Sequence, residues 1–167
     1  YPLPEAQLDR FMMNIFIDYL DEEEELQVVN QTTTNEEIDL QPIFNGEEMR
    51  QFTRLVRLVP VAEPIARYAV QLVQASRPGP KAADFIQQWV NWGAGTRGSQ
   101  NLILAAKARA LLHGHFHVSI ADIQAVAAPV LRHRILPNFR AEADRVGVEE
   151  IIQRLIDTVP KPKSNLG

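Results

Sequence analysis

The chain has 167 residues, a formal net charge of -4 and no cysteine. Its length suffices for one well-packed core or two small units. The lack of cysteine excludes disulfides and thiolate metal sites. The sequence contains no apolar run of about eighteen residues, so we expect no membrane-spanning helix and a cytoplasmic protein. The pI of about 5.6 argues against a general nucleic-acid-binding protein.

The first twenty residues predict the edge of a sheet-containing domain. Tyr1 opens the chain in place of an initiator methionine, so we expect a piece of a longer protein. Residues 12–20 are apolar and alternate at Ile15, Ile17 and Tyr19, which predicts one strand whose partner strands lie elsewhere. A short helix or turn is expected to lead into this strand.

From residue 21 onward, apolar residues recur at helical spacing and predict an all-α bundle of five or six helices. Asn45 is a candidate N-cap, and Ser119 is another, with Asp122 three residues further on. Seven helical segments are expected, at about residues 22–30, 45–59, 62–77, 83–92, 97–113, 119–131 and 148–159, and five or six of them form the bundle.

The predicted fold class is therefore mainly α. A short N-terminal remnant of an α/β core, residues 1–20, includes one strand. The helical bundle covers residues 21–160, and residues 161–167, rich in proline and lysine, predict a disordered tail.

Two charged clusters and one histidine cluster need an interpretation. The acidic run at residues 21–25 and the basic cluster of residues 132–134 with Arg140 are each expected to be a solvated face or a complement to a helix end. A subunit-contact surface is the alternative for residues 132–134. His113, His115 and His117 have a spacing that can serve a metal ion, but no acidic or cysteine cluster joins them, so we expect them to pack or cap and predict no metal site. Trp89 and Trp92 are expected in the core or at its rim.

Two arginines occur in distinctive sequence contexts. Arg10 belongs to the stretch 3–11, Leu-Pro-Glu-Ala-Gln-Leu-Asp-Arg-Phe, directly before the predicted strand. Arg97 follows two closely spaced glycines, Gly93 and Gly95, and begins the long helix expected at 97–113. Guanidinium groups offer a planar set of donors to phosphate oxygens, and glycines permit a tight turn that brings a helix N-terminus close to a phosphate.

Both contexts resemble segments of the MoxR-type AAA+ ATPases. Further segments are similar to that family in order and spacing: 56–61, 72–77, 104–112, 118–123 and 130–135. The resemblance implies that residues 1–20 are the end of an AAA+ core, with the arginine-finger segment and the last strand. It also implies that residues 21–160 are the helical lid domain.

The resemblance assigns roles to both arginines. It implies that Arg10 is catalytic and acts in trans on the γ-phosphate of ATP bound by a neighbouring subunit. Arg97 is implied to be the cofactor-binding sensor 2 residue, acting in cis on ATP of its own subunit. The family commonly has serine, proline and alanine where this chain has Gly95, Thr96 and Gly98, and often arginine in place of His115.

The implied function is that of an ATP- and Mg²⁺-dependent remodelling or chaperone-like factor for the maturation of partner proteins. It would work as a homo-oligomeric ring, expected to be a hexamer, with von Willebrand A-domain proteins or other clients as partners. The glycine-rich phosphate loop is absent from this sequence, so the fragment alone should bind no cofactor and should be inactive.

Two alternatives remain open at this point. The chain could be a non-catalytic helical protein-interaction module, in which both arginines are surface features. A DNA-binding helical domain is disfavoured by the acidic pI and by the lack of a basic recognition helix.

Overall fold

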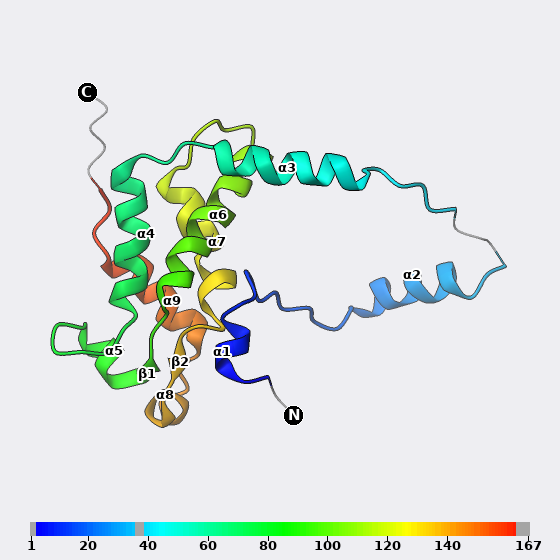
Figure 1. Ribbon diagram of the computed structural model, residues 1–167. Helices are drawn as coiled ribbons and strands as arrows, with labels where there is room; N and C mark the ends of the chain where they lie inside the picture. Colours follow the sequence, from blue (N-terminus) through cyan, green and yellow to red (C-terminus); the bar gives the residue numbers. More distant parts are fainter. Residues whose placement is uncertain (1–2, 36–38, 163–167) are drawn as a thin grey trace.

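Four helices form the centre of the molecule in the computed structural model, which describes residues 3–35 and 39–162 (Figure 1). They pack around one apolar core. The long helix α6 contacts both α4 and α7, and α9 also lies against those two helices. These central helices are α4 (Glu63–Ala75), α6 (Thr96–Leu112), α7 (Ile120–Leu131) and α9 (Val148–Thr158).

Shorter elements complete the bundle. Helix α3 packs against α6, and α8 packs against α5. Strand β1 follows α5 without a break and pairs antiparallel with β2. The helices α1 and α2 precede the bundle in the chain (Figure 1). The bounds are α1 (Glu5–Leu8), α2 (Glu22–Thr32), α3 (Gly46–Leu58), α5 (Asp84–Trp89), β1 (Val90–Trp92), β2 (Leu136–Pro137) and α8 (Phe139–Ala143).

The core is built mainly from aliphatic side chains of these elements, and burial of such apolar surface is the main favourable term in folding. Its largest fully buried members are Tyr68, Leu72, Ile86, Leu102, Ile123, Leu131, Ile135, Ile151, Ile152 and Leu155. The buried hydroxyl of Tyr68 accepts a hydrogen bond from Gln124 at 3.0 Å. Trp89 is buried and donates to Asp144 at 2.8 Å, whereas Trp92 is exposed, so the two tryptophans lie in the core and at its rim as expected.

The helix ends follow the predicted chemistry. Asn45 and Ser119 are the N-caps of α3 and α7, and both form capping boxes. The acidic run at residues 21–25 is exposed and supplies the N-cap and first turn of α2, where negative charge complements the helix dipole. At the end of α6, Gly114 has a φ of +73° and His115 donates its amide to the carbonyl of Ala110 at 2.8 Å. This Schellman arrangement ends the helix.

Two expectations about local structure were wrong, and one short helix was missed. Residues 13–21 have no regular secondary structure, although a strand was predicted at 12–20. A strand requires a partner, and none of the described residues pairs with this stretch. Residues 90–92 form β1 rather than the last turn of a helix, because they pair with β2. The short helix α8 was not predicted at all. Of the expected tail, residues 163–167 lie outside the described residues.

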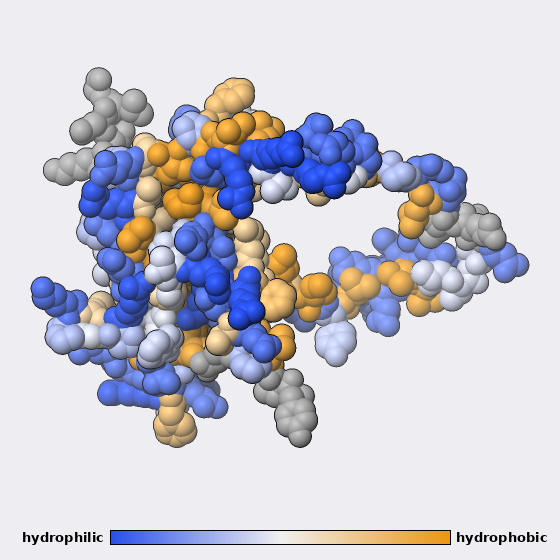
Figure 2. All heavy atoms as spheres, viewed as in Figure 1, coloured by the Kyte–Doolittle hydropathy of each residue, from blue (hydrophilic) through white to orange (hydrophobic). Residues whose placement is uncertain are grey.

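The unpaired N-terminal stretch carries apolar side chains into solvent. Ile17 is 94% exposed and Tyr19 is 100% exposed. Figure 2 shows apolar atoms along the chain between the bundle and α2, which itself lies away from the bundle in Figure 1. In the part of the chain that the structure describes, no helix combines the length and the apolar character that crossing a membrane requires.

The turn before α6 tolerates no side chain at Gly93. A Cβ atom there would lie 2.4 Å from the main-chain oxygen of Ser76. We therefore predict that Gly93→Ala lowers the free energy of unfolding by about 1–3 kcal/mol, because backbone must shift to admit the methyl group. Urea unfolding measures this change. Gly79→Ala is the matched control, since no atom lies within 4 Å of its Cβ position. Equal stability of the two variants would contradict the packing described for this turn.

Candidate functional site

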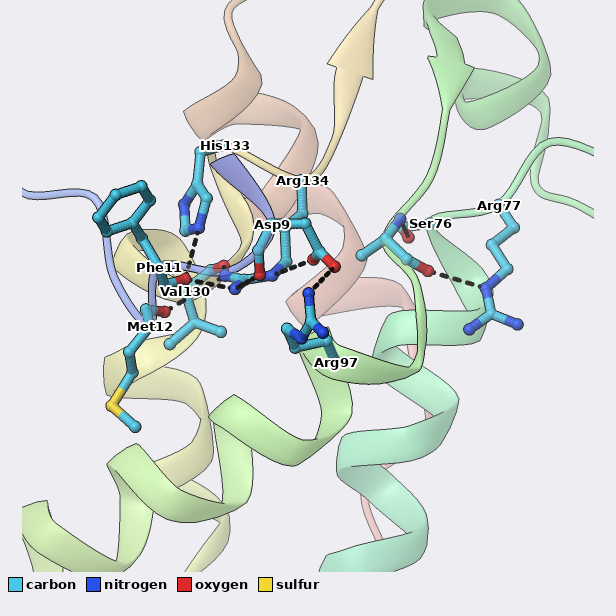
Figure 3. Close-up of polar contacts among 10 residues, drawn as sticks. Asp9, Phe11, Met12, Ser76, Arg77, Arg97, Val130, His133 and Arg134 are labelled. Atoms are coloured by element: carbon cyan, nitrogen blue, oxygen red, sulfur yellow. Dashed lines mark hydrogen bonds and ion pairs between the residues drawn. The ribbon is translucent and has the colours of Figure 1, made fainter. Parts of the chain in front are cut away.

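Arg97 lies in the first turn of α6, as the sequence predicted. The turn in front of it is held by the end of α4 (Figure 3). The buried hydroxyl of Ser76 accepts a hydrogen bond from the amide of Ala94 at 2.9 Å, and Arg77 Nε donates to the Ala94 carbonyl at 2.9 Å. Both polar groups of Ala94 are thereby fixed, which sets the direction in which α6 begins.

The two glycines of this turn contribute differently. Gly93 is required because Ser76 lies against it, as described above. Gly95 is the N-cap of α6, with φ -80° and ψ -178°, a conformation that any residue adopts, and open space surrounds its Cβ position. It provides no side-chain cap, so the first amides of α6 have no side-chain acceptor from that position.

Arg10 lies just after α1, on a segment that packs against the end of α7. The side chain of Arg10 is exposed. The residues on either side of it are held by the triplet 132–134, in which each side chain contacts the N-terminal segment. His133 Nε2 lies 3.1 Å from the carbonyl of Phe11, and Arg132 donates to the carbonyl of Asn14 at 3.1 Å.

The carboxylate of Asp9 connects the two segments (Figure 3). Its Oδ2 atom lies 3.1 Å from Arg97 Nη1, and its Oδ1 atom lies 2.9 Å from Arg134 Nε. Arg134 is buried, whereas the Arg97 side chain is 46% exposed. An ion pair this exposed contributes at most about 1 kcal/mol, so Asp9 holds Arg97 only weakly.

The structure brings Arg10 and Arg97 to the same hollow. This hollow has a volume of about 740 Å³, and α6 forms much of its wall. Arg57, from the last turn of α3, also lines it, together with polar residues of α6 such as Ser99 and Gln100. Among the described residues that line it there is no Asp or Glu. Three arginines and the start of a helix make this surface suited to an anion.

The histidine cluster has a different role. His113 Nδ1 lies 2.9 Å from the carbonyl of Arg109, so this side chain caps the end of α6 as expected. The rings of His113 and His115 are 6.4 Å apart, centroid to centroid. Within residues 3–35 and 39–162, no group of three or more histidine, cysteine or acidic side chains is arranged to hold a metal ion.

The sequence did not reveal the role of residues 132–134. They were expected to complement a helix end or to form a subunit contact. Arg134 does donate to the carbonyl of Val130 in the last turn of α7, and in addition all three side chains hold the segment that carries Arg10. The sequence shows only that these residues directly follow an apolar helix. From that position, an exposed basic patch cannot be distinguished from buried side chains that bind another segment. Only the burial of Arg134, at 1% of its side-chain surface, separates the two interpretations.

His133 couples this contact to pH. Burial and the positive charge of Arg134 lower the pKa of His133 below its usual value of 6.5. Because the carbonyl of Phe11 accepts from Nε2, the second proton would go to Nδ1, which is buried and has no hydrogen-bond partner. The folded protein therefore favours the neutral imidazole.

We predict that the free energy of unfolding falls as the pH is lowered from 6.5 through the lower folded-state pKa of His133, since the unfolded chain then binds the proton more readily. Urea unfolding between about pH 7.5 and about pH 5 measures the slope. His133→Gln keeps a donor for Phe11 but does not titrate, so its slope in this window should be smaller. The same slope in both proteins would contradict the assignment. Asp122 and Asp144 do not interfere, because their pKa values lie below 3.8.

Comparison with known proteins identifies the relatives of this chain. Residues 83–155 match the family model described as the AAA lid domain. The chain is 33% identical to chaperone MoxR1 of Mycobacterium tuberculosis over 166 residues, covering 99% of this chain and 44% of that protein. It is 34% identical to YeaC of Bacillus subtilis over 163 residues, covering 97% and 48%.

A crystal structure of a Cytophaga hutchinsonii protein, named for a proposed ATPase activity, superimposes with a TM-score of 0.90. The two sequences are 35% identical, and the matched region covers 98% of the present chain and 50% of the Cytophaga chain. The chain thus spans about half the length of the relatives it matches. Together these similarities show that the chain belongs to the MoxR-type AAA+ ATPases and corresponds to a C-terminal portion that contains their lid domain.

Proposed function

We propose that this chain supplies two arginines, Arg10 and Arg97, to ATP hydrolysis by the intact MoxR-type protein. The observation that carries the proposal is that both residues line one hollow whose described lining contains no carboxylate. Negative charge builds on the phosphoryl group during transfer, and fixed guanidinium groups stabilise that charge without rearrangement. ATP and Mg²⁺ would be bound mainly by the part of the protein outside this chain, so the fragment alone should be inactive.

The shared hollow changes the expected division of labour. The resemblance implied that Arg10 serves a neighbouring subunit and Arg97 its own. Asp9, next to Arg10 in the chain, is also paired with Arg97, which supports the proposal that the two arginines serve one site. We therefore propose that both arginines reach the same nucleotide, the one held by the neighbouring subunit.

The ring architecture belongs to the same proposal. A residue that serves a neighbour's nucleotide requires a closed oligomer, and we propose a homo-oligomeric ring, with a hexamer as the expected size. The relative MoxR1 is named a chaperone, and we extend to this protein a cytoplasmic role in remodelling client proteins, including von Willebrand A-domain proteins. The domain division at residues 20 and 160 is part of this proposal as well.

The first test is substitution in the full-length protein. We expect Arg10→Ala and Arg97→Ala each to lower ATP turnover strongly, by about 10³-fold or more for Arg10, while the ring still assembles. Arg67→Ala is the control, because Arg67 is exposed, pairs with Glu63 one turn away and does not line the hollow. Turnover of both variants close to that of the control would favour a non-catalytic interaction module.

A mixing experiment separates the two divisions of labour. Rings are assembled from Arg10→Ala subunits and Arg97→Ala subunits, with two different affinity tags to verify that the rings are mixed. If both arginines serve one nucleotide, every interface lacks one of them and turnover stays low. If Arg97 served its own subunit and Arg10 the neighbour, some interfaces would contain both arginines and turnover would recover.

A further inference from the structure

Arg134 is a buried cation at the end of α7 that the proposed chemistry does not use. Only 1% of its side-chain surface is exposed. Burial lowers the pKa of Arg134 below its usual range, while Asp9 opposes that shift, and the guanidinium remains charged. A buried charge is strongly destabilising unless hydrogen-bond acceptors surround it. The groups that accept hydrogen bonds from Arg134 therefore show which segment this residue binds.

Every N–H of this guanidinium has an acceptor. A guanidinium carries five N–H donors. The Nε atom donates to Asp9 Oδ1 at 2.9 Å, and one terminal nitrogen donates to the carbonyls of Val130 and Met12. The other terminal nitrogen donates to the carbonyls of Asp9, at 2.8 Å, and Phe11. Figure 3 shows these partners gathered around the side chain.

Four of the five acceptors bracket Arg10. They belong to residues 9, 11 and 12, so the main chain on both sides of Arg10 is tied to one rigid group. The fifth acceptor, Val130, belongs to α7 itself and fixes the guanidinium to the bundle. The contacts span 125 residues of sequence and do not depend on the exposed side chain of Arg10.

We infer that Arg134 is the positioning residue for Arg10: it sets where the Arg10 guanidinium stands relative to the hollow and to Arg97. This inference rests on the proposed function. A misplacement of about 1 Å can lower a rate by about 10²-fold, so a catalytic arginine on an otherwise irregular segment needs such a support. A lysine in place of Arg134 keeps the charge, but its three N–H donors sit on one nitrogen atom. It cannot donate to the acceptors on both sides of Arg10 at the same time.

The test uses the full-length protein and four variants: Arg134→Lys, Arg10→Ala, the double variant, and Arg109→Lys. Arg109 is the matched control, because it forms a partly buried ion pair with Asp122 inside the bundle, away from residues 9–12. Thermal unfolding of each variant verifies that it is folded. Turnover at saturating ATP and the Kd for a non-hydrolysable ATP analogue are then measured.

We expect Arg134→Lys to lower turnover by about 10²-fold with the Kd for the analogue changed by less than about 3-fold. In the Arg10→Ala background, the same substitution should lower turnover by less than about 3-fold, because a residue that acts through Arg10 has no effect once Arg10 is gone. Arg109→Lys should leave turnover within about 3-fold of the unmodified protein.

Equal losses from Arg134→Lys in both backgrounds would overturn the inference, since the effect would then be a general structural one. Unchanged turnover in Arg134→Lys, with turnover lost in Arg10→Ala, would overturn the inference alone. Normal turnover in Arg10→Ala would overturn the proposed function. Should Arg134→Lys fail to fold, Asp9→Asn replaces it, with a loss of about 10-fold that again depends on Arg10.

Discussion

The enclosed guanidinium of Arg134 is the contact on which the rest of the site depends. It joins the end of α7 to residues 9–12 with a full set of hydrogen bonds, and no water-exposed surface weakens them. Arg132, His133 and the carbonyl of Pro129, which accepts from the amide of Asn14, also hold this stretch, which has no regular secondary structure of its own after α1. The position of Arg10 therefore depends on the end of α7 as much as on the segment that contains Arg10.

Asp9 extends this constraint to the other arginine. Because one oxygen of its carboxylate binds the buried Arg134 and the other the half-exposed Arg97, the two cations differ in how firmly they are held. Arg134 cannot leave without exposing buried acceptors, whereas Arg97 can exchange its partner at little cost. Of the two arginines, Arg97 is therefore the one that would change its partner if a nucleotide bound in the hollow.

Local chemistry made much of the bundle predictable. The N-caps Asn45 and Ser119 and the helical spacing that follows each of them fixed the start of α3 and α7, because capping involves residues close together in the sequence. Arg97 was placed correctly at the start of α6 because the glycine-containing turn before it and the helical spacing after it are also local signals. The buried face of α9 followed from its strong periodicity.

Contacts between distant residues were beyond that reasoning. The pairing of β1 with β2 turned residues 90–92 away from the helix that their sequence favours. The stretch 12–20 has the pattern of a strand but no partner within the described residues, so a correct pattern led to a wrong element. For the candidate site, the sequence identified Arg10 and Arg97 as separate features. Their common hollow, and the clamp by residues 132–134, depend on packing between segments that are 88 to 125 residues apart.

The most direct test of this account is a structure of the full-length ring with a bound ATP analogue. The account predicts that Arg10 and Arg97 of one subunit both lie within hydrogen-bond distance of phosphate oxygens of a single nucleotide. It also predicts that Arg134 still donates to Asp9 and to the carbonyls around Arg10. A structure in which the two arginines contact different nucleotides, or in which residues 9–12 have left Arg134, would contradict it.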